Sequence, residues 1–269
     1  MFKSNVKFVG KVKTSSWRKV ALGTWKVVGD SQIYSMISVN VEPALDFIKK
    51  HPGITMTHVA GAIGGRIIEK YPHINCIERF GKVYQREDIA IFFQVASDTA
   101  GKDLTGYTVR AAHKKTPHQF AEEMRGAVKS IKNGDDKEYK KVKGTLKNIP
   151  GFFMGYIINF LGFLLYTLNI WSPLLGSPRD SFGSMMITNI GSLGMQRGWA
   201  PLVPYSRVPI LLTLGKVYER PVAVNGEVKI QKTIDCCFTV DHRIIDGMIG
   251  SKMEKEFNRL FAHPEELMS

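Results

Sequence analysis

The sequence predicts a single α/β domain, because segments with strand-like alternation and segments with helical spacing are interleaved along all 269 residues. Ile33 to Val41 alternates apolar and polar side chains, which is the pattern of a half-buried strand. Glu42-Pro43 follows directly and is typical of a helix start, so we expect a helix through Lys50. Hydrophobic residues make up 44% of the chain, which is enough for one large core or two modest ones.

A helix and a pair of strands are predicted next. Thr57 is placed as the N-cap of a helix over residues 58–71, and Pro72 ends this helix. Its many small residues favour close packing against a sheet or another helix. Val83-Tyr84 and residues 88–95 are expected to pair as strands, for example in a hairpin.

The remaining elements have clear start signals. Thr116 and Gln119 have the spacing of a capping box, so a helix is expected from there to about Lys132. Residues 234–241 alternate between two faces and predict a last strand, and residues 248–261 predict a last helix.

Charge and cysteine usage limit the partners and the compartment. The chain carries 37 Lys and Arg against 24 Asp and Glu, a net charge of +13 that attracts polyanions. No nucleic-acid-binding motif accompanies this charge, so we expect no nucleic acid partner. Cys76, Cys236 and Cys237 lack metal-ligand spacing, so we expect no metal site. We expect the three thiols to be reduced, in the cytoplasm or an equivalent reducing compartment. The basic segment 1–13 does not resemble a signal peptide.

An apolar segment interrupts the α/β pattern. Residues 148–178 contain no charged side chain, and a helix over residues 152–171 would be about 30 Å long, the thickness of a bilayer core. Gly155 and Asn159 weaken it as a lipid-exposed span. Three interpretations remain open: an element resting on a membrane surface, a lining for an acyl chain, or a contact between subunits.

The last predicted strand leads into the most informative motif, Asp241-His242-Arg243-Ile244-Ile245-Asp246-Gly247. This heptad resembles the active-site motif of the acyltransferase components (dihydrolipoamide acyltransferases) of 2-oxo-acid dehydrogenase complexes, which share a catalytic fold with chloramphenicol acetyltransferase. Other stretches resemble that family in the same order along the chain: Trp17-Arg18-Lys19, residues 57–75, Asp88-Ile89-Ala90-Ile91 and Met186-Ile187-Thr188-Asn189-Ile190-Gly191.

The resemblance implies a chloramphenicol-acetyltransferase-like two-layer fold, with a mixed sheet and packed helices. Residues 14–269 are expected to form one catalytic domain, in which residues 148–178 are an apolar insertion and residues 1–13 a basic N-terminal segment. A membrane span at the insertion would separate the two halves of this domain, so we do not expect one. The sequence shows no lipoyl domain and no subunit-binding domain.

Acyl transfer to a thiol needs a base, because a thiol with a pKa of about 8.5 is mostly protonated at neutral pH. Imidazole has a pKa near about 6.5 and can accept that proton, and we assign this role to His242. By resemblance, the Thr188 hydroxyl donates to the oxyanion of the tetrahedral intermediate. The alternative for Thr188 is a buried strand-end hydroxyl bonded to the backbone.

The other motif residues are expected to support the site. Asp246 belongs to the catalytic set, and the resemblance pairs it with an arginine, for which Arg18 is the candidate. Asp246 could equally cap the following helix. Gly247 allows close backbone approach or positive φ, while Asn189 and Gly191 shape the turn after the Thr188 strand. Arg243 is expected to form a structural ion pair.

The resemblance also implies partners. CoA or an acyl-CoA is the expected substrate. The expected acceptor is a dihydrolipoyl-type thiol or another group, and a lipoyl or acyl-carrier domain on a separate protein could supply it in trans. The family places base and oxyanion donor on adjoining subunits, so we expect a homotrimer, which could assemble further into a cubic or icosahedral core. Two other hypotheses are a structural core without turnover, and a membrane-associated acyl-chain handler that uses residues 151–171. A peripheral membrane contact there is also compatible with the enzyme.

Overall fold

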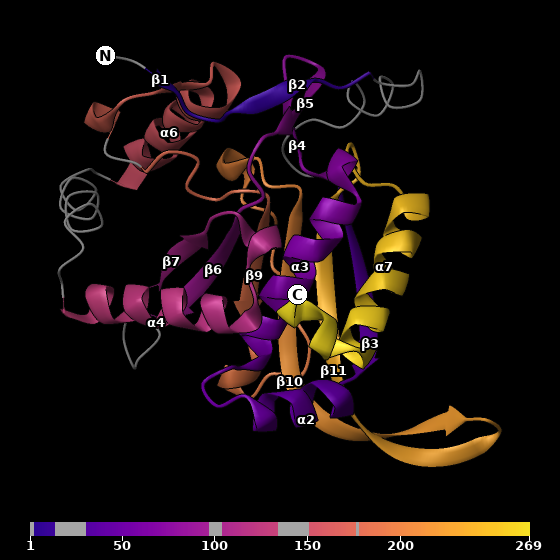
Figure 1. Cartoon of the computed structure of the whole chain (residues 1–269). Helices are drawn as coiled ribbons and strands as arrows, with labels where there is room; N and C mark the ends of the chain where they lie inside the picture. The colour runs from indigo at the N-terminus through magenta and orange to yellow at the C-terminus, as the bar shows by residue number, and fades with distance from the viewer. Residues whose placement is uncertain (1–2, 14–30, 97–103, 134–150, 176–177) are drawn as a thin grey trace.

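A six-stranded mixed sheet forms the centre of the molecule (Figure 1). The computed structural model describes residues 3–13, 31–96, 104–133, 151–175 and 178–269. Strand β9 is parallel to both of its neighbours, and the other pairs are antiparallel, which confirms the predicted mixed sheet. In spatial order the strands are β3 (Gln32–Asn40), β11 (Glu227–Asp241), β10 (Ile210–Val224), β9 (Met185–Asn189), β6 (Ile91–Ala96) and β7 (Leu104–Val109).

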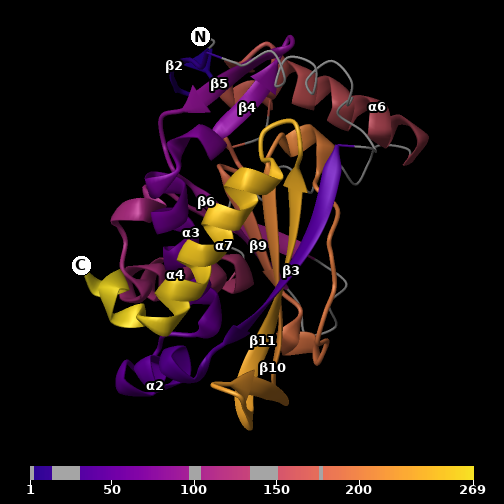
Figure 2. The ribbon, with the colours of Figure 1, turned by 90° about the vertical axis from the view of Figure 1, so that its right-hand side faces the viewer.

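Helices form a second layer on one face of this sheet, as the side view in Figure 2 shows. The predicted helices are all present, with starts and ends close to those expected. The capping box at Thr116 is confirmed, because its backbone N–H donates to Gln119 Oε1 and its hydroxyl accepts from the Gln119 N–H. The four helices are α2 (Glu42–Lys50), α3 (Met56–Lys70), α4 (Pro117–Asn133) and α7 (Gly247–Ala262).

The placement of Thr57 as the cap of α3 was wrong by two residues. Thr55 is the N-cap, and His58 completes a capping box by accepting from the Thr55 N–H at 3.1 Å. The sequence reasoning considered only glutamate or glutamine as the reciprocal partner, whereas the imidazole Nδ1 serves here. Thr57 instead accepts a hydrogen bond from Asn189, at the end of β9.

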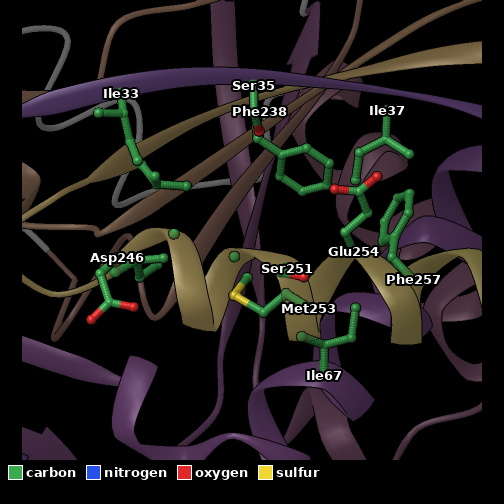
Figure 3. Close-up of a pocket in the computed structure, with 14 residues that line it drawn as sticks. Ile33, Ser35, Ile37, Ile67, Phe238, Asp246, Ser251, Met253, Glu254 and Phe257 are labelled. Carbon is green, nitrogen blue, oxygen red and sulfur yellow. The ribbon is translucent and has the colours of Figure 1, made fainter.

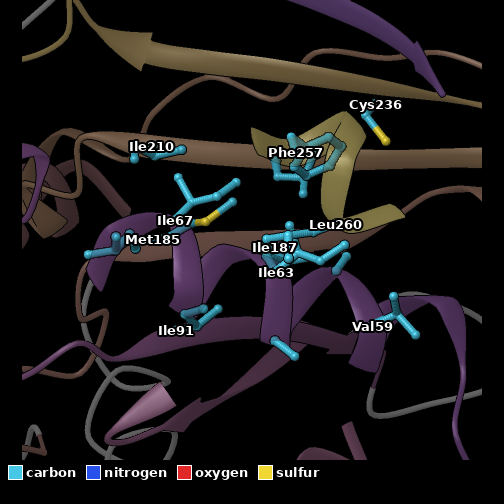
Figure 4. Close-up of a cluster of buried hydrophobic side chains, with 14 of the residues drawn as sticks. Val59, Ile63, Ile67, Ile91, Met185, Ile187, Ile210, Cys236, Phe257 and Leu260 are labelled. Atoms are coloured by element: carbon cyan, nitrogen blue, oxygen red, sulfur yellow. The ribbon is translucent and has the colours of Figure 1, made fainter. Parts of the chain in front are cut away.

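The main core lies between α3, α7 and the sheet (Figure 4). Helix α3 approaches its neighbours closely because it carries glycines where side chains would collide. A Cβ at Gly64 would lie 3.0 Å from Met185 Sδ, and one at Gly65 would lie 2.7 Å from the Ala112 carbonyl oxygen. The close packing predicted for this helix is therefore confirmed.

A smaller sheet corrects the predicted pairing of residues 83–95. Strand β5 (Lys82–Arg86) pairs with β4 (Cys76–Arg79) and β2 (Phe8–Lys11), while β6 belongs to the central sheet. The reason is the tight turn at Phe80-Gly81, where both residues have positive φ and connect β4 to β5. Since β2 and β1 (Lys3–Ser4) both pair with later strands, the basic N-terminal segment contributes to the fold.

The apolar segment folds as a short helix followed by a return strand. Helix α6 (Gly151–Gly162) continues into one π-helical turn (Phe163–Thr167), and β8 (Ile170–Trp171) then pairs with β1. Asn169 between them has a φ of 57°, which reverses the chain. Within the described residues, no helix is both long and apolar enough to cross a membrane.

Candidate active site

The turn between β11 and α7 holds His242 in a defined orientation. Its backbone N–H donates to the Ser31 carbonyl at 2.6 Å, and its ring Nδ1 lies 2.9 Å from the Ile245 carbonyl oxygen. Because a carbonyl can only accept, Nδ1 carries the proton and Nε2 of the neutral ring holds the lone pair. The turn therefore fixes the tautomer that can act as a base through Nε2.

Asp246 caps the helix that follows this turn. Its side chain accepts from the Ile249 N–H at 3.0 Å, so the N-cap interpretation is confirmed. The capped helix start fixes the backbone immediately beyond His242. Gly247 is the first residue of α7. Its φ is not in the left-handed region and a Cβ there would meet no atom within 4 Å, so neither role expected for this glycine is correct. Arg18, the expected ion-pair partner of Asp246, lies outside the described residues.

A buried cluster of ion pairs stabilises the turn that carries His242. The guanidinium of Arg243 binds both carboxylate oxygens of Asp241, with Nη2 to Oδ2 at 2.6 Å, and Nη1 lies 3.6 Å from Glu78 Oε2. The side chains of Asp241 and Arg243 are 9% and 6% exposed. The structural ion pair predicted for Arg243 is confirmed, and it joins the residues on either side of His242.

The second group of candidate residues lies at the end of β9. Asn189 donates to the Thr57 hydroxyl at 2.9 Å and accepts from the Ser192 N–H at 3.2 Å, so its side chain bridges α3 and the turn after β9. Gly191 allows this turn to lie against β10, because a Cβ there would be 2.4 Å from the Gly215 carbonyl oxygen. Thr188 is half-buried and is the next-to-last residue of β9.

One chain does not bring Thr188 and His242 together. Thr188 is level with Thr213 on β10, which is level with Cys237 on β11, five residues before His242. Five residues of strand span about 16 Å, and strand β10 lies between β9 and β11, which adds two strand spacings of about 5 Å each sideways. Thr188 also alternates with Ile187, which faces the α3 core, so it lies on the opposite face of the sheet.

Sequence reasoning missed a buried carboxylate on that opposite face. The side chain of Asp235 is 0% exposed and accepts from Ser38 Oγ at 2.6 Å, Arg197 Nε at 2.6 Å and Tyr218 Oη at 3.0 Å. Burial opposes the charge, but these donors and Arg197 keep the pKa of Asp235 below its usual range. The sequence did contain one indication of this site, because Asp235 is a charged residue among the mostly apolar residues 234–240 of β11.

The cysteines are structural rather than reactive. All three are buried and unpaired with one another, and burial raises the pKa of Cys76 to about 12. A thiol with such a raised pKa is protonated and unreactive at neutral pH. Among the residues that the structure describes, no three His, Cys, Asp or Glu side chains are grouped to hold a metal ion.

Comparison with known proteins points to one family. Residues 179–269 match the model of the 2-oxoacid dehydrogenases acyltransferase catalytic domain. The dihydrolipoyllysine-residue acetyltransferase component of the pyruvate dehydrogenase complex of Acholeplasma laidlawii is 37% identical over 86 residues, which are 32% of this chain and 15% of that protein. The lipoamide acyltransferase component of the branched-chain alpha-keto acid dehydrogenase complex of Bacillus subtilis is 22% identical over 207 residues, 76% of this chain and 38% of that protein. The chain thus covers well under two thirds of either relative.

Solved structures agree on the fold. The dihydrolipoamide acetyltransferase of Azotobacter vinelandii superposes with a TM-score of 0.63 at 13% identity, covering 88% of this chain and 84% of that one. A chloramphenicol acetyltransferase superposes with a TM-score of 0.56 at 14% identity, covering 94% and 100% of the two chains. The chain is therefore similar over residues 179–269 to the catalytic domain of the 2-oxoacid dehydrogenase acyltransferases, and it has the fold that these enzymes share with chloramphenicol acetyltransferase.

Proposed function

We propose that this protein is a CoA-dependent acyltransferase with His242 as its general base. The observation that carries the proposal is the hydrogen bond from His242 Nδ1 to the Ile245 carbonyl, within the segment that matches the acyltransferase family. This bond leaves Nε2 as the proton acceptor. The relative from Azotobacter vinelandii has been studied for the catalytic roles of a serine, a histidine and an asparagine, and the asparagine follows the histidine by four positions. Asp246 follows His242 by the same spacing.

The proposed reaction moves an acyl group from the CoA thioester to an acceptor thiol of the dihydrolipoyl type. His242 Nε2 takes the proton of the acceptor thiol, and the resulting thiolate attacks the thioester carbonyl. The tetrahedral oxyanion accepts a hydrogen bond from the Thr188 hydroxyl. Collapse of the intermediate expels the CoA thiolate, which recovers the proton from the imidazolium. No net oxidation or reduction takes place.

The proposed assembly is a homotrimer in which each site is shared by two copies. Its support is the separation of Thr188 and His242 within one chain, which only a neighbouring copy can bridge. The acceptor is proposed to be a lipoyl group carried by a separate protein, and trimers could build a larger cubic or icosahedral core. In this proposal residues 14–269 make one catalytic domain, to which the N-terminal segment adds β1 and β2. The domain works in the cytoplasm or an equivalent reducing compartment, where the three free cysteines stay reduced.

A contact of residues 151–171 with a membrane surface is a second proposal. Helix α6 has no charged residue, and Tyr156, Phe160 and Phe163 are 77%, 60% and 44% exposed. These positions recur at helical spacing, so the aromatic side chains form one stripe that could enter a bilayer interface. Flotation with anionic liposomes is expected to recover the wild type and to recover Phe160→Ser less. Equal recovery of the two proteins would rule out this contact.

The enzymatic proposal is tested with dihydrolipoamide and a series of acyl-CoA donors. We expect acyl-CoA-dependent loss of free thiol, which His242→Ala lowers by at least about a hundredfold, the low end for a lost general base. His118→Ala, at another half-buried histidine, is the matched control and is expected to retain the wild-type rate. If no donor is consumed while every variant assembles normally, the protein is a structural core without turnover.

A further inference from the structure

An apolar cavity of about 260 Å³ lies beside the His242 turn, between β3, β11 and α7 (Figure 3). Its walls include Ile37 of β3, Phe238 and Val240 of β11, and Met253 and Phe257 of α7. Side chains of this kind bind hydrocarbon rather than polar groups. The cavity takes up part of the space where a helix and a sheet would otherwise pack directly.

Two glycines on α7 keep this cavity open. A Cβ at Gly247 or Gly250 would meet no atom within 4 Å, and neither residue has a positive φ. Neither close packing nor backbone geometry therefore requires glycine at these positions. Glycine inside a helix is less stable than alanine, so Gly250 in the first turn of α7 lowers helix stability and leaves room for a ligand.

One end of the cavity adjoins the proposed catalytic base. Ile245, Asp246 and Gly247 line it, and the Ile245 carbonyl accepts the His242 Nδ1 hydrogen bond. Val240, two residues before His242, lies about 7 Å from it along the strand. Figure 3 shows Asp246 at one end of the cavity and Phe257 at the other, so its long axis follows α7 away from the turn.

We propose that this cavity binds the hydrocarbon tail of the acyl group, and that the preferred donor is an acyl-CoA of about six carbons rather than acetyl-CoA. This inference rests on the proposed acyltransferase function. An apolar cavity of about 150 Å³ is large enough for a six-carbon ring. The cavity of about 260 Å³ therefore accommodates a linear or branched tail of at least this size.

The expected preference follows from the burial of methylene groups. Each methylene group moved from water into an apolar site improves kcat/KM by about fourfold when fully buried. Hexanoyl differs from acetyl by four methylene groups, but burial of the tail is incomplete, because Ile33 in the wall of the cavity is 36% exposed. We therefore expect the wild type to prefer hexanoyl-CoA over acetyl-CoA by at least about tenfold in kcat/KM.

The test compares both donors on wild type, Gly250→Leu and Gly126→Leu. Leucine at position 250 fills the cavity, while position 126 is an exposed glycine of α4 whose Cβ also meets nothing within 4 Å, which makes it the matched control. Gly250→Leu is expected to lower kcat/KM for hexanoyl-CoA at least about tenfold and to change that for acetyl-CoA less than about threefold. Gly126→Leu is expected to change neither.

Calorimetric binding of hexanoyl-CoA separates failure of this inference from failure of the proposed function. Suppose that acetyl-CoA is used, but Gly250→Leu lowers kcat/KM equally for both donors or leaves both values unchanged. The protein is then an acyltransferase whose cavity does not bind the acyl tail. If no donor reacts, the proposed function fails. In that case, weaker binding of hexanoyl-CoA to Gly250→Leu than to wild type, with equal binding of CoA, would still support an acyl-binding cavity, and equal binding of hexanoyl-CoA would overturn it.

Discussion

The substitution Asp241→Asn tests whether the ion pair beneath His242 holds the turn together. Asparagine keeps the size of the side chain and one acceptor for the Arg243 backbone N–H, but it removes the charge that binds the guanidinium. Because the Arg243 side chain is only 6% exposed, water cannot replace the lost partner. The remaining carboxylate, Glu78, lies 3.6 Å from Nη1 and compensates in part.

The expected cost is about 3 kcal/mol in the free energy of unfolding. Removing one partner of a buried pair costs about 3–5 kcal/mol, and Glu78 places this case at the low end. For a domain of this size, that corresponds to a fall of about 6–12 °C in Tm. Guanidinium denaturation and calorimetry measure both quantities. Asp241→Asn combined with Arg243→Met is expected to cost about 2 kcal/mol less than the sum of the single changes. The double variant removes both charges of the pair, and Glu78 keeps a partner in Arg207, whose Nη1 lies 3.8 Å from Glu78 Oε2.

Asp46→Asn is the matched control for this prediction. Asp46 pairs with Lys49 on the surface of α2 at 2.8 Å, and both side chains are mostly exposed. Its removal is expected to leave the unfolding midpoint unchanged, because exposed pairs contribute little. If Asp241→Asn costs no more than Asp46→Asn, or if the double variant is additive, then the buried pair does not act as a unit and the proposed support of His242 is wrong.

Two further substitutions test the packing and the electrostatics of the fold. Gly191→Ala places a Cβ 2.4 Å from the Gly215 carbonyl oxygen and is expected to destabilise the protein by about 1–3 kcal/mol, which denaturant unfolding measures; an unchanged midpoint would show that the turn after β9 moves freely. Hydrogen bonds from Arg259 and Lys70 hold the pKa of Glu256 at about 2, below its usual value near 4.5. A depressed carboxyl pKa contributes stability that is complete above about pH 4.5 and is lost as the pH falls toward 2. Since Lys70 and Arg259 are about half exposed, we expect this pH-dependent contribution to the free energy of unfolding to be about 1–2 kcal/mol. Glu256→Gln is expected to remove this part of the acid sensitivity. Parallel stability curves for both proteins from pH 5 to 2.5 would contradict the assignment.

Elements with strong local signals were predictable from the sequence. The strand from Gln32 to Asn40 differs from its prediction by one residue at each end, because alternation and Glu42-Pro43 mark it clearly. The cap at Asp246 was one of the two roles that the sequence left open for this residue, because aspartate directly before a helical pattern is a common N-cap. The error at Thr55 arose because the capping partner is a histidine, a residue type outside the usual pattern.

Features that depend on distant residues could not be predicted. The β4–β5 hairpin needs positive φ at both Phe80 and Gly81, and aromatic residues rarely adopt it, so only Gly81 marks this turn in the sequence. The site around Asp235 brings this residue together with Ser38, Arg197 and Tyr218. The four residues come from four separate segments, and nothing in their spacing connects them. The separation of Thr188 from His242 was expected only through the family resemblance, because it follows from strand order and residue spacing alone does not specify that order.

Co-expression of two inactive variants tests the central claim most directly. His242→Ala lacks the base and Thr188→Val lacks the oxyanion donor, so neither should turn over acyl-CoA alone. In randomly mixed trimers, each site draws its base from one copy and its donor from another, so about a quarter of the sites are intact. We predict that the mixture recovers about a quarter of the wild-type rate. If the wild type is active but the mixture is as inactive as its two components, the site is not shared between copies.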